Sequence, residues 1–313
     1  MEDFSLIYMG TPAFALPPLR ALVYNNYRIN AVITQPDKPR GRGKKLIPTP
    51  VKEYAGKAGL PCLEPGSLKD PDFLEKIREL SPSLIVTAAY GKILPPSLLE
   101  LPPLGCINLH FSLLPRYRGA APVQRAIMEG EKETGVTVFF MDRGMDTGDI
   151  ILQEKAAILE GETAGELLTR LADLGAEALV KAVGMLKEGR APRRPQDPGK
   201  ATEAPPLWRE EELIDWQAEA ERVASQINGL SPSPGSHSFL LGRRLKFLRA
   251  LAAGGSGPPG RVLDIGGEGF LVAAGRGAVQ VLEVQPEGKK PMPAGDFARG
   301  YRIGPGALFD RSG

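Results

Sequence analysis

The sequence contains very few of the residues that bind metals or form disulfides. Its 313 residues include two histidines and two cysteines, Cys62 and Cys106. The cysteines do not have the spacing of zinc ligands or of a redox pair, so we expect buried free thiols in a reducing compartment. Aspartates at positions 142, 146 and 149 do not have the spacing of a calcium loop, with its central Gly and closing Glu. We therefore expect no metal site.

Long hydrophobic runs are also missing. No stretch approaches the roughly 18 apolar residues of a membrane span. Glu2 and Asp3 directly precede a strand-like run, so we expect no signal peptide and a cytoplasmic protein. The formal net charge is only +2, so a nucleic-acid partner must be sought in local basic patches. Gly10-Thr-Pro12 lacks the further glycines of a dinucleotide fingerprint, and we predict no NAD.

The first 189 residues alternate between strand-like and helical stretches. Predicted strands cover residues 5–9, 29–34, 83–89, 104–110 and 134–141, and predicted helices cover residues 13–24, 121–130 and 162–187. This alternation is typical of a doubly wound, mostly parallel α/β sheet of the Rossmann-like kind. We therefore predict one α/β domain over residues 1–189.

The composition changes after the last of these helices. Residues 190–208 are basic and rich in proline without periodicity, which indicates a linker. Beyond it we predict a helix over 214–227 and short strands at 238–241, 244–248, 261–265, 269–273 and 279–284. That spacing favours a small β-barrel over residues 209–313. From Arg222 onward there are 12 Lys and Arg against 6 Asp and Glu, which fits phosphate contacts about as well as a solvated face.

Asn108 and His110 are two residues apart at the end of the apolar run 104–110. Side chains at i and i+2 of a strand point to one face. Open α/β sheets bind ligands at the carboxyl ends of their strands. An amide can donate to a developing oxyanion, and an imidazole can move a proton near neutral pH. The pair therefore predicts a catalytic site, although a hydrogen-bonded structural histidine is the alternative.

The string that follows the pair is too apolar for an ordinary surface loop. Ser112-Leu-Leu-Pro115 places leucines directly after the predicted strand, which suits a pocket for a flat, partly apolar ligand. Downstream, a buried strand leads into residues 142–149, where Asp146 is one of the three aspartates. This segment is either a plain acidic turn or the source of a carboxylate that orients His110.

These strings together resemble the 10-formyltetrahydrofolate-dependent formyltransferases, and further strings resemble the methionyl-tRNA formyltransferases among them. The resemblance rests on Asn108-Leu-His-Phe-Ser-Leu-Leu-Pro-Arg-Tyr-Arg-Gly-Ala-Ala-Pro122 and on Met145-Asp-Thr-Gly-Asp149. It extends to Met9-Gly-Thr-Pro-Ala-Phe-Ala15, Gln35-Pro-Asp-Lys-Pro39 and Gln285-Pro-Glu-Gly-Lys-Lys290, so it covers nearly the whole chain.

The resemblance implies roles for particular residues. Asn108, His110 and Asp146 match the family's catalytic set. Ser112, Leu113, Leu114 and Pro115 match its folate segment. The C-terminal barrel would be OB-like and hold tRNA.

A basic loop between Thr34 and Pro48 lies where the family has an insertion that contacts the acceptor arm of tRNA. Its basic residues include Arg40, Arg42, Lys44 and Lys45, and a solvated loop is the alternative. Phe14 matches a family position near the methionyl side chain, although a core aromatic is nearly as good an explanation.

The implied reaction is transfer of a formyl group to the α-amine of methionyl-initiator-tRNA, for translation initiation, by a monomer. Two alternatives remain. One is a folate-dependent formyltransferase acting on a sugar amine or sugar nucleotide, and the other is a tRNA- or folate-binding protein without activity.

Overall fold

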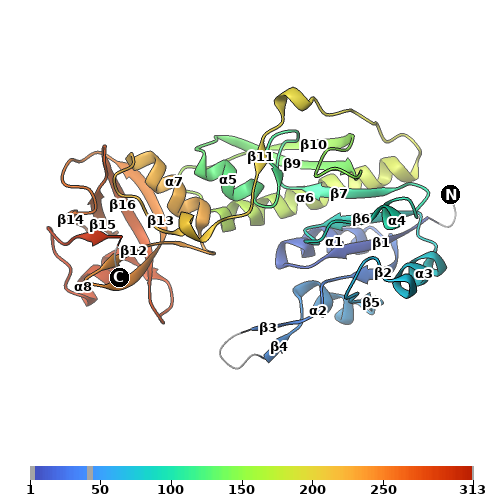
Figure 1. The fold of residues 1–313 in the computed structure, drawn as a ribbon, viewed down its shortest axis with the longest axis horizontal. Coiled ribbons are helices and arrows are strands. Elements are labelled where there is room, and N and C mark those ends of the chain that lie inside the picture. The colour runs from blue at the N-terminus through green and yellow to red at the C-terminus, as the bar shows by residue number, and fades with distance from the viewer. Residues whose placement is uncertain (1–3, 41–44, 312–313) are drawn as a thin grey trace. The chain divides into compact units, whose positions relative to one another are not determined.

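The computed structural model of the protein describes residues 4–40 and 45–311. The chain divides into two compact units (Figure 1). The first unit comprises residues 1–119, 135–156 and 169–203, and the second comprises residues 120–134, 157–168 and 204–313. Each unit is described separately below.

The first unit is built on a seven-stranded sheet with the order β10-β9-β7-β6-β1-β2-β5 (Figure 1). The strands β5, β2, β1, β6 and β7 pair in parallel, whereas β9 pairs with β7 in antiparallel orientation. The mostly parallel sheet is thus confirmed. The strands are β1 (Ser5–Gly10), β2 (Arg28–Ile33), β5 (Cys62–Leu63), β6 (Leu84–Ala88), β7 (Cys106–His110), β9 (Glu133–Phe140) and β10 (Ile150–Ala157).

Helices cover the sheet because its strands are apolar on both faces. One face carries Ile7, Met9, Ile85 and Cys106, which pack with α3 (Pro71–Leu80) and α4 (Pro96–Leu99). On the opposite face Leu109 meets α6 (Ala164–Lys187). A Cβ on Gly175 of that helix would lie 2.8 Å from a Leu109 methyl group, so the glycine permits the close approach. Asn108 and His110 alternate with Leu109 and therefore share the face of Cys106.

Several elements of this unit have sequence signals that our prediction did not use. Helices α2 (Pro50–Lys57) and α3 each begin with a proline after a capping residue, Thr49 and Asp70 respectively. The predicted helix over 13–24 is present as a 3-10 turn, η1 (Ala13–Ala15), followed by α1 (Leu16–Tyr24). Helix α5 (Pro122–Met128), within the predicted range 121–130, belongs to the second unit.

Parts of the predicted loop between β2 and α2 form strands. Lys38–Arg40 and Lys45–Ile47 form an antiparallel pair, β3 and β4. The glycines and proline of this region gave a loop signal, but backbone pairing between two short runs outweighs it. The prediction of a loop between Thr34 and Pro48 was therefore wrong for residues 38–40 and 45–47.

The second unit contains an antiparallel sheet with the order β14-β15-β16-β13-β12-β18. Its two ends meet, because Val262 N donates to Ala307 O and Phe309 N donates to Gly260 O, each at 2.8 Å. The predicted small β-barrel is therefore confirmed as a curled sheet. The strands are β12 (Ser236–Leu240), β13 (Arg243–Ala253), β14 (Val262–Ile265), β15 (Phe270–Ala273), β16 (Ala278–Pro286), β17 (Met292–Pro293) and β18 (Phe309–Asp310).

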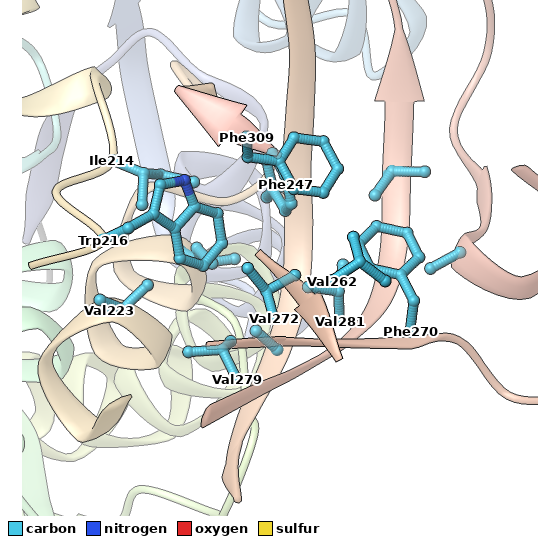
Figure 2. Close-up of a cluster of buried hydrophobic side chains, with 14 of the residues drawn as sticks. Ile214, Trp216, Val223, Phe247, Val262, Phe270, Val272, Val279, Val281 and Phe309 are labelled. Atoms are coloured by element: carbon cyan, nitrogen blue, oxygen red, sulfur yellow. The ribbon is translucent and has the colours of Figure 1, made fainter. Parts of the chain in front are cut away.

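Aromatic side chains fill the interior of this sheet, as Figure 2 shows. Phe247, Phe270 and Phe309 are at most 2% exposed, with ring centroids 5.2 to 6.5 Å apart. Trp216 packs on Phe247, and its indole nitrogen donates to Ser238 at 3.0 Å. Burial of such rings is the main source of stability in a small barrel.

The predicted helix over residues 214–227 was wrong in its first half. Helix α7 begins at Ala220 and ends at Leu230. Ile214 and Trp216 are buried in the barrel core while Asp215 between them is more exposed, which is the alternation of an extended segment. Ile214 N accordingly donates to His237 O at 2.9 Å.

The two cysteines differ in burial. Burial of Cys106 raises the pKa of its thiol to about 12, as expected for a buried free thiol. Cys62 is only partly buried, which differs from our expectation.

Among the helices of the described residues, none is both long and apolar enough to cross a bilayer.

Candidate active site

Asn108 and His110 lie at the carboxyl end of β7, as the strand periodicity predicts. In the sheet, Asn108 is paired with Thr87 of β6 and with Phe139 of β9. His110 is 6% exposed, and its ring meets Phe139 edge to face with centroids 6.5 Å apart. The central position of β7 thus fixes both backbones, and the pleat directs both side chains to one face.

A threonine orients the amide of Asn108. Thr87 Oγ1 donates to Asn108 Oδ1 at 2.6 Å, and Thr87 is 2% exposed. Because this bond occupies the amide oxygen, the NH₂ group points the other way. The amide is therefore presented as a donor, which is the arrangement needed to hold a developing negative charge on oxygen.

The imidazole of His110 lies between a carbonyl and a carboxylate. Its Nε2 atom is 2.8 Å from the Tyr117 carbonyl, and its Nδ1 atom is 3.6 Å from Oδ2 of Asp146. A carbonyl can only accept, so Nε2 carries a hydrogen and donates it. Nδ1 is then the nitrogen that faces the carboxylate. The structure thus places Asp146, from the turn after β9, beside His110, on the face of β7 that Asn108 shares.

Asp146 is held in an unusual backbone conformation. Its φ angle is +55°, in the left-handed region that side chains other than glycine rarely adopt. Its carboxylate accepts from Gly119 N at 2.9 Å through the same Oδ2 atom that faces His110. The loop also needs Gly148, because a Cβ there would lie 1.8 Å from the Phe140 carbonyl oxygen. These constraints fix where the carboxylate lies.

The apolar segment after β7 is folded back on the protein. Ser112 Oγ donates to Arg116 O at 2.6 Å, and Thr137 Oγ1 donates to Ser112 O at 2.6 Å. Leu114 is 3% exposed, whereas Leu113 and Pro115 are only partly buried. The segment can therefore offer the sides of Leu113 and Pro115 to a ligand.

The other predicted residues are placed unevenly. Phe14, after β1, meets Phe111 edge to face with ring centroids 5.6 Å apart, so it lies next to the residue that follows His110. Arg40 and Lys45 are directly paired across the β3–β4 hairpin. Arg42 and Lys44 lie outside the described residues.

Three contributors to this site were missed by the sequence analysis. They are the hydroxyl of Thr87, the carbonyl of Tyr117 and the amide of Gly119. Two of them are backbone groups: every residue carries a carbonyl, and every residue except proline carries an N–H. No sequence signal could have distinguished them. Within residues 4–40 and 45–311, His, Cys, Asp and Glu side chains form no group of three or more that could hold a metal ion.

Both parts of the chain match known families. Residues 5–183 match the family described as formyl transferase, and residues 206–302 match the formyl transferase C-terminal domain. The chain is 52% identical to methionyl-tRNA formyltransferase of Moorella thermoacetica over 306 residues, covering 97% of this chain and 98% of the relative. It is 48% identical to the methionyl-tRNA formyltransferase of Syntrophus aciditrophicus over 311 residues, covering 99% of this chain and all of the relative.

Solved structures share the fold at lower identity. The sugar 3N-formyl transferase WlaRD superimposes with a TM-score of 0.66 at 18% identity, covering 92% of this chain and 99% of that chain. Methionyl-tRNA formyltransferase from Clostridium thermocellum gives a TM-score of 0.56 at 20% identity, covering 79% of this chain and 92% of that chain. With both family matches and the nearly full-length relatives, the chain belongs to the methionyl-tRNA formyltransferase family of formyl transferases.

Proposed function

We propose that this protein transfers the formyl group of 10-formyltetrahydrofolate to the α-amino group of methionyl-initiator-tRNA, for translation initiation. The main observation behind the proposal is the sequence identity to methionyl-tRNA formyltransferases, which extends over nearly the full length of the chain. In the same chain Asp146 lies beside His110, on the strand face that Asn108 shares. We further propose that it acts in the cytoplasm as a monomer. In this scheme residues 1–189 form the catalytic domain, 190–208 the linker and 209–313 the tRNA-binding domain.

The reaction forms a carbon–nitrogen bond at the methionyl amine, breaks the bond between the formyl carbon and the folate nitrogen, and moves one proton between the two nitrogens. The folate supplies the formyl group and the nitrogen that finally takes the proton. Asn108 donates from its free NH₂ group to the formyl oxygen as negative charge develops there. Thr87 keeps the amide in the donating orientation.

His110 and Asp146 move the proton in this proposal. The Nε2–H of His110 is engaged by the Tyr117 carbonyl, so Nδ1 exchanges the proton on the side of Asp146. The 3.6 Å separation of Nδ1 and Oδ2 exceeds a direct hydrogen bond. We therefore propose that the proton passes between the two atoms through a water.

The residues of the folate segment suit a flat ligand with an apolar part. Leu113 and Pro115 are partly buried, and they alternate with the inward-facing Ser112 and Leu114. For tRNA, we assign Arg40, Arg42, Lys44 and Lys45 to phosphate and acceptor-arm contacts. Phe14 is proposed to contact the methionyl side chain, because it lies beside Phe111.

A direct assay tests the proposal against its alternative. The protein is incubated with 10-formyltetrahydrofolate and either methionyl-initiator-tRNA or a panel of amino sugars and sugar nucleotides. Formylated methionyl-tRNA alone supports the proposal. A formylated sugar would favour the alternative, and no product with any acceptor would indicate a binding protein without activity.

A further inference from the structure

We propose that Gln196 is a positioning residue for the proposed catalytic pair His110 and Asp146, so that the segment after α6 is part of the active site. This inference rests on the proposed function. The proposed linker begins in this segment, and its residues up to 203 group with the first unit. Gln196 is partly buried, while Pro195 and Asp197 on either side of it are exposed.

The side chain of Gln196 uses all of its hydrogen-bonding capacity. Its Nε2 atom donates to the carbonyls of Asp146 and Gly148, both at 2.8 Å. Its Oε1 atom accepts from Nε and Nη2 of Arg118, at 3.1 and 2.7 Å. The reverse orientation would place the amide oxygen against two carbonyls and the NH₂ group against a guanidinium, so the orientation is unique.

These four bonds connect the two loops that set the geometry of the pair. On one side Gln196 holds the carbonyl of Asp146 itself, whose φ angle is +55°, and the carbonyl of Gly148 two residues further on. On the other side it holds Arg118. The neighbours of Arg118 make the two backbone contacts to the pair, from Tyr117 O to His110 and from Gly119 N to Asp146.

Thr202 supports the same loop from further along the segment. Tyr117 N donates to Thr202 Oγ1, and Arg118 N donates to Thr202 O, each at 2.9 Å. Arg194 pairs with Ile150 at the start of β10 through two backbone hydrogen bonds of 2.8 and 3.1 Å. The segment is thus anchored on both sides of Gln196. This anchoring fixes the position of the Gln196 amide, and the amide in turn holds the two loops.

The proposal predicts that loss of Gln196 acts through Asp146. A catalytic group displaced by about 1 Å can cost on the order of 100-fold in rate. Gln196→Met keeps the length of the side chain and removes all four bonds. Gln196→Glu keeps the acceptor for Arg118 but faces a carboxylate toward two carbonyls. Both should lower kcat by about 10- to 100-fold while KM for each substrate changes less than about threefold.

A double-mutant cycle distinguishes positioning from general structural support. In an Asp146→Ala background the carboxylate is already missing, so Gln196→Met should cost less than about threefold more. An equal penalty in both backgrounds, or none in the wild type, would overturn the proposal. Asp197→Asn is the matched control, because that exposed side chain caps Gly199 in its own turn, and it should leave kcat unchanged.

A second readout needs no substrate. The chain has two histidines, so the ring signals of His110 and His237 can be followed by NMR in the full-length protein. Gln196→Met should shift the His110 signal in the direction set by Asp146→Ala, with little further shift in the double variant, and His237 should not move. An unchanged His110 signal would overturn the inference. If wild type formylates no acceptor while the His110 signal shifts, the proposed function fails and the positioning role stands.

Discussion

Asp146 Oδ2 lies 3.6 Å from Nδ1 of His110 and accepts a hydrogen bond from Gly119 N at 2.9 Å. The same carboxylate oxygen therefore accepts a hydrogen bond from a fixed backbone N–H and faces the ring nitrogen. This arrangement holds the carboxylate beside the imidazole before any substrate binds. Groups that are already in place cost no reorganisation when charge develops during the reaction, whereas water molecules would have to reorient.

The amide of Asn108 provides the first test. Asn108→Ala should lower kcat by roughly 100- to 1000-fold, the usual cost of losing one oxyanion donor, with folate binding little changed. Thr87→Val should cost at most about tenfold, because it removes the bond that orients the amide and leaves the donor itself in place. Steady-state kinetics and folate titration measure both effects. Weaker folate binding with intact turnover would show that Asn108 is a ligand contact instead.

His110 and Asp146 should behave as a unit. Turnover is measured for His110→Ala, Asp146→Ala and the double variant. Because each residue depends on the other for proton movement, the double variant should be about as slow as the slower single variant. Penalties that multiply would mean that the two side chains act independently, and the shared proton path would then be wrong.

Substitutions in the basic segment between β3 and β4 should affect tRNA affinity and the choice between tRNAs separately. Lys44→Ala should reduce the salt slope of tRNA affinity by roughly one unit, because a phosphate contact releases about one counterion. Arg42→Ala should reduce the preference for initiator over elongator methionyl-tRNA, since a planar guanidinium makes directional bonds. Neither change should alter folate affinity. If the Arg42→Ala variant kept the wild-type preference, discrimination between the tRNAs would have to come from the C-terminal unit.

A salt bridge in the second unit should make stability depend on pH. Arg125 binds Glu211 through two bonds of 2.5 and 2.9 Å, and this pairing lowers the pKa of the Glu211 carboxyl. A lowered pKa in the folded state gives stability that is present above the unfolded pKa of about 4.3 and is lost as the pH falls through the folded value.

Glu211→Gln should therefore lower the Tm at neutral pH. The expected loss in free energy of unfolding is about 0.5–1 kcal/mol, because the salt bridge is partly exposed. The difference from wild type should shrink in acid, once Glu211 is protonated. Calorimetric unfolding of the full chain at both pH values measures this, with the exposed Glu210→Gln as control. A constant difference at all pH values would assign the effect to packing.

The sequence by itself determined the face that Asn108 and His110 share. They are two residues apart on an apolar strand, and the pleat of a strand follows from local backbone geometry alone. The barrel strands were likewise predictable, because turn residues separate short apolar runs. The helix over 214–227 was wrong at its start because burial of Ile214 and Trp216 in the barrel is a tertiary effect that overrides local propensity.

Only the tertiary structure decided which partners complete the site. Asp146 follows His110 by 36 residues and Gln196 lies 50 residues further along the chain, so no local pattern brings them together. The left-handed turn at Asp146 is held by Gly119 through its carboxylate and by Gln196 through its carbonyl. The loop contacts that orient His110 and Asp146 are the backbone groups Tyr117 O and Gly119 N, which every sequence provides and only the fold can position.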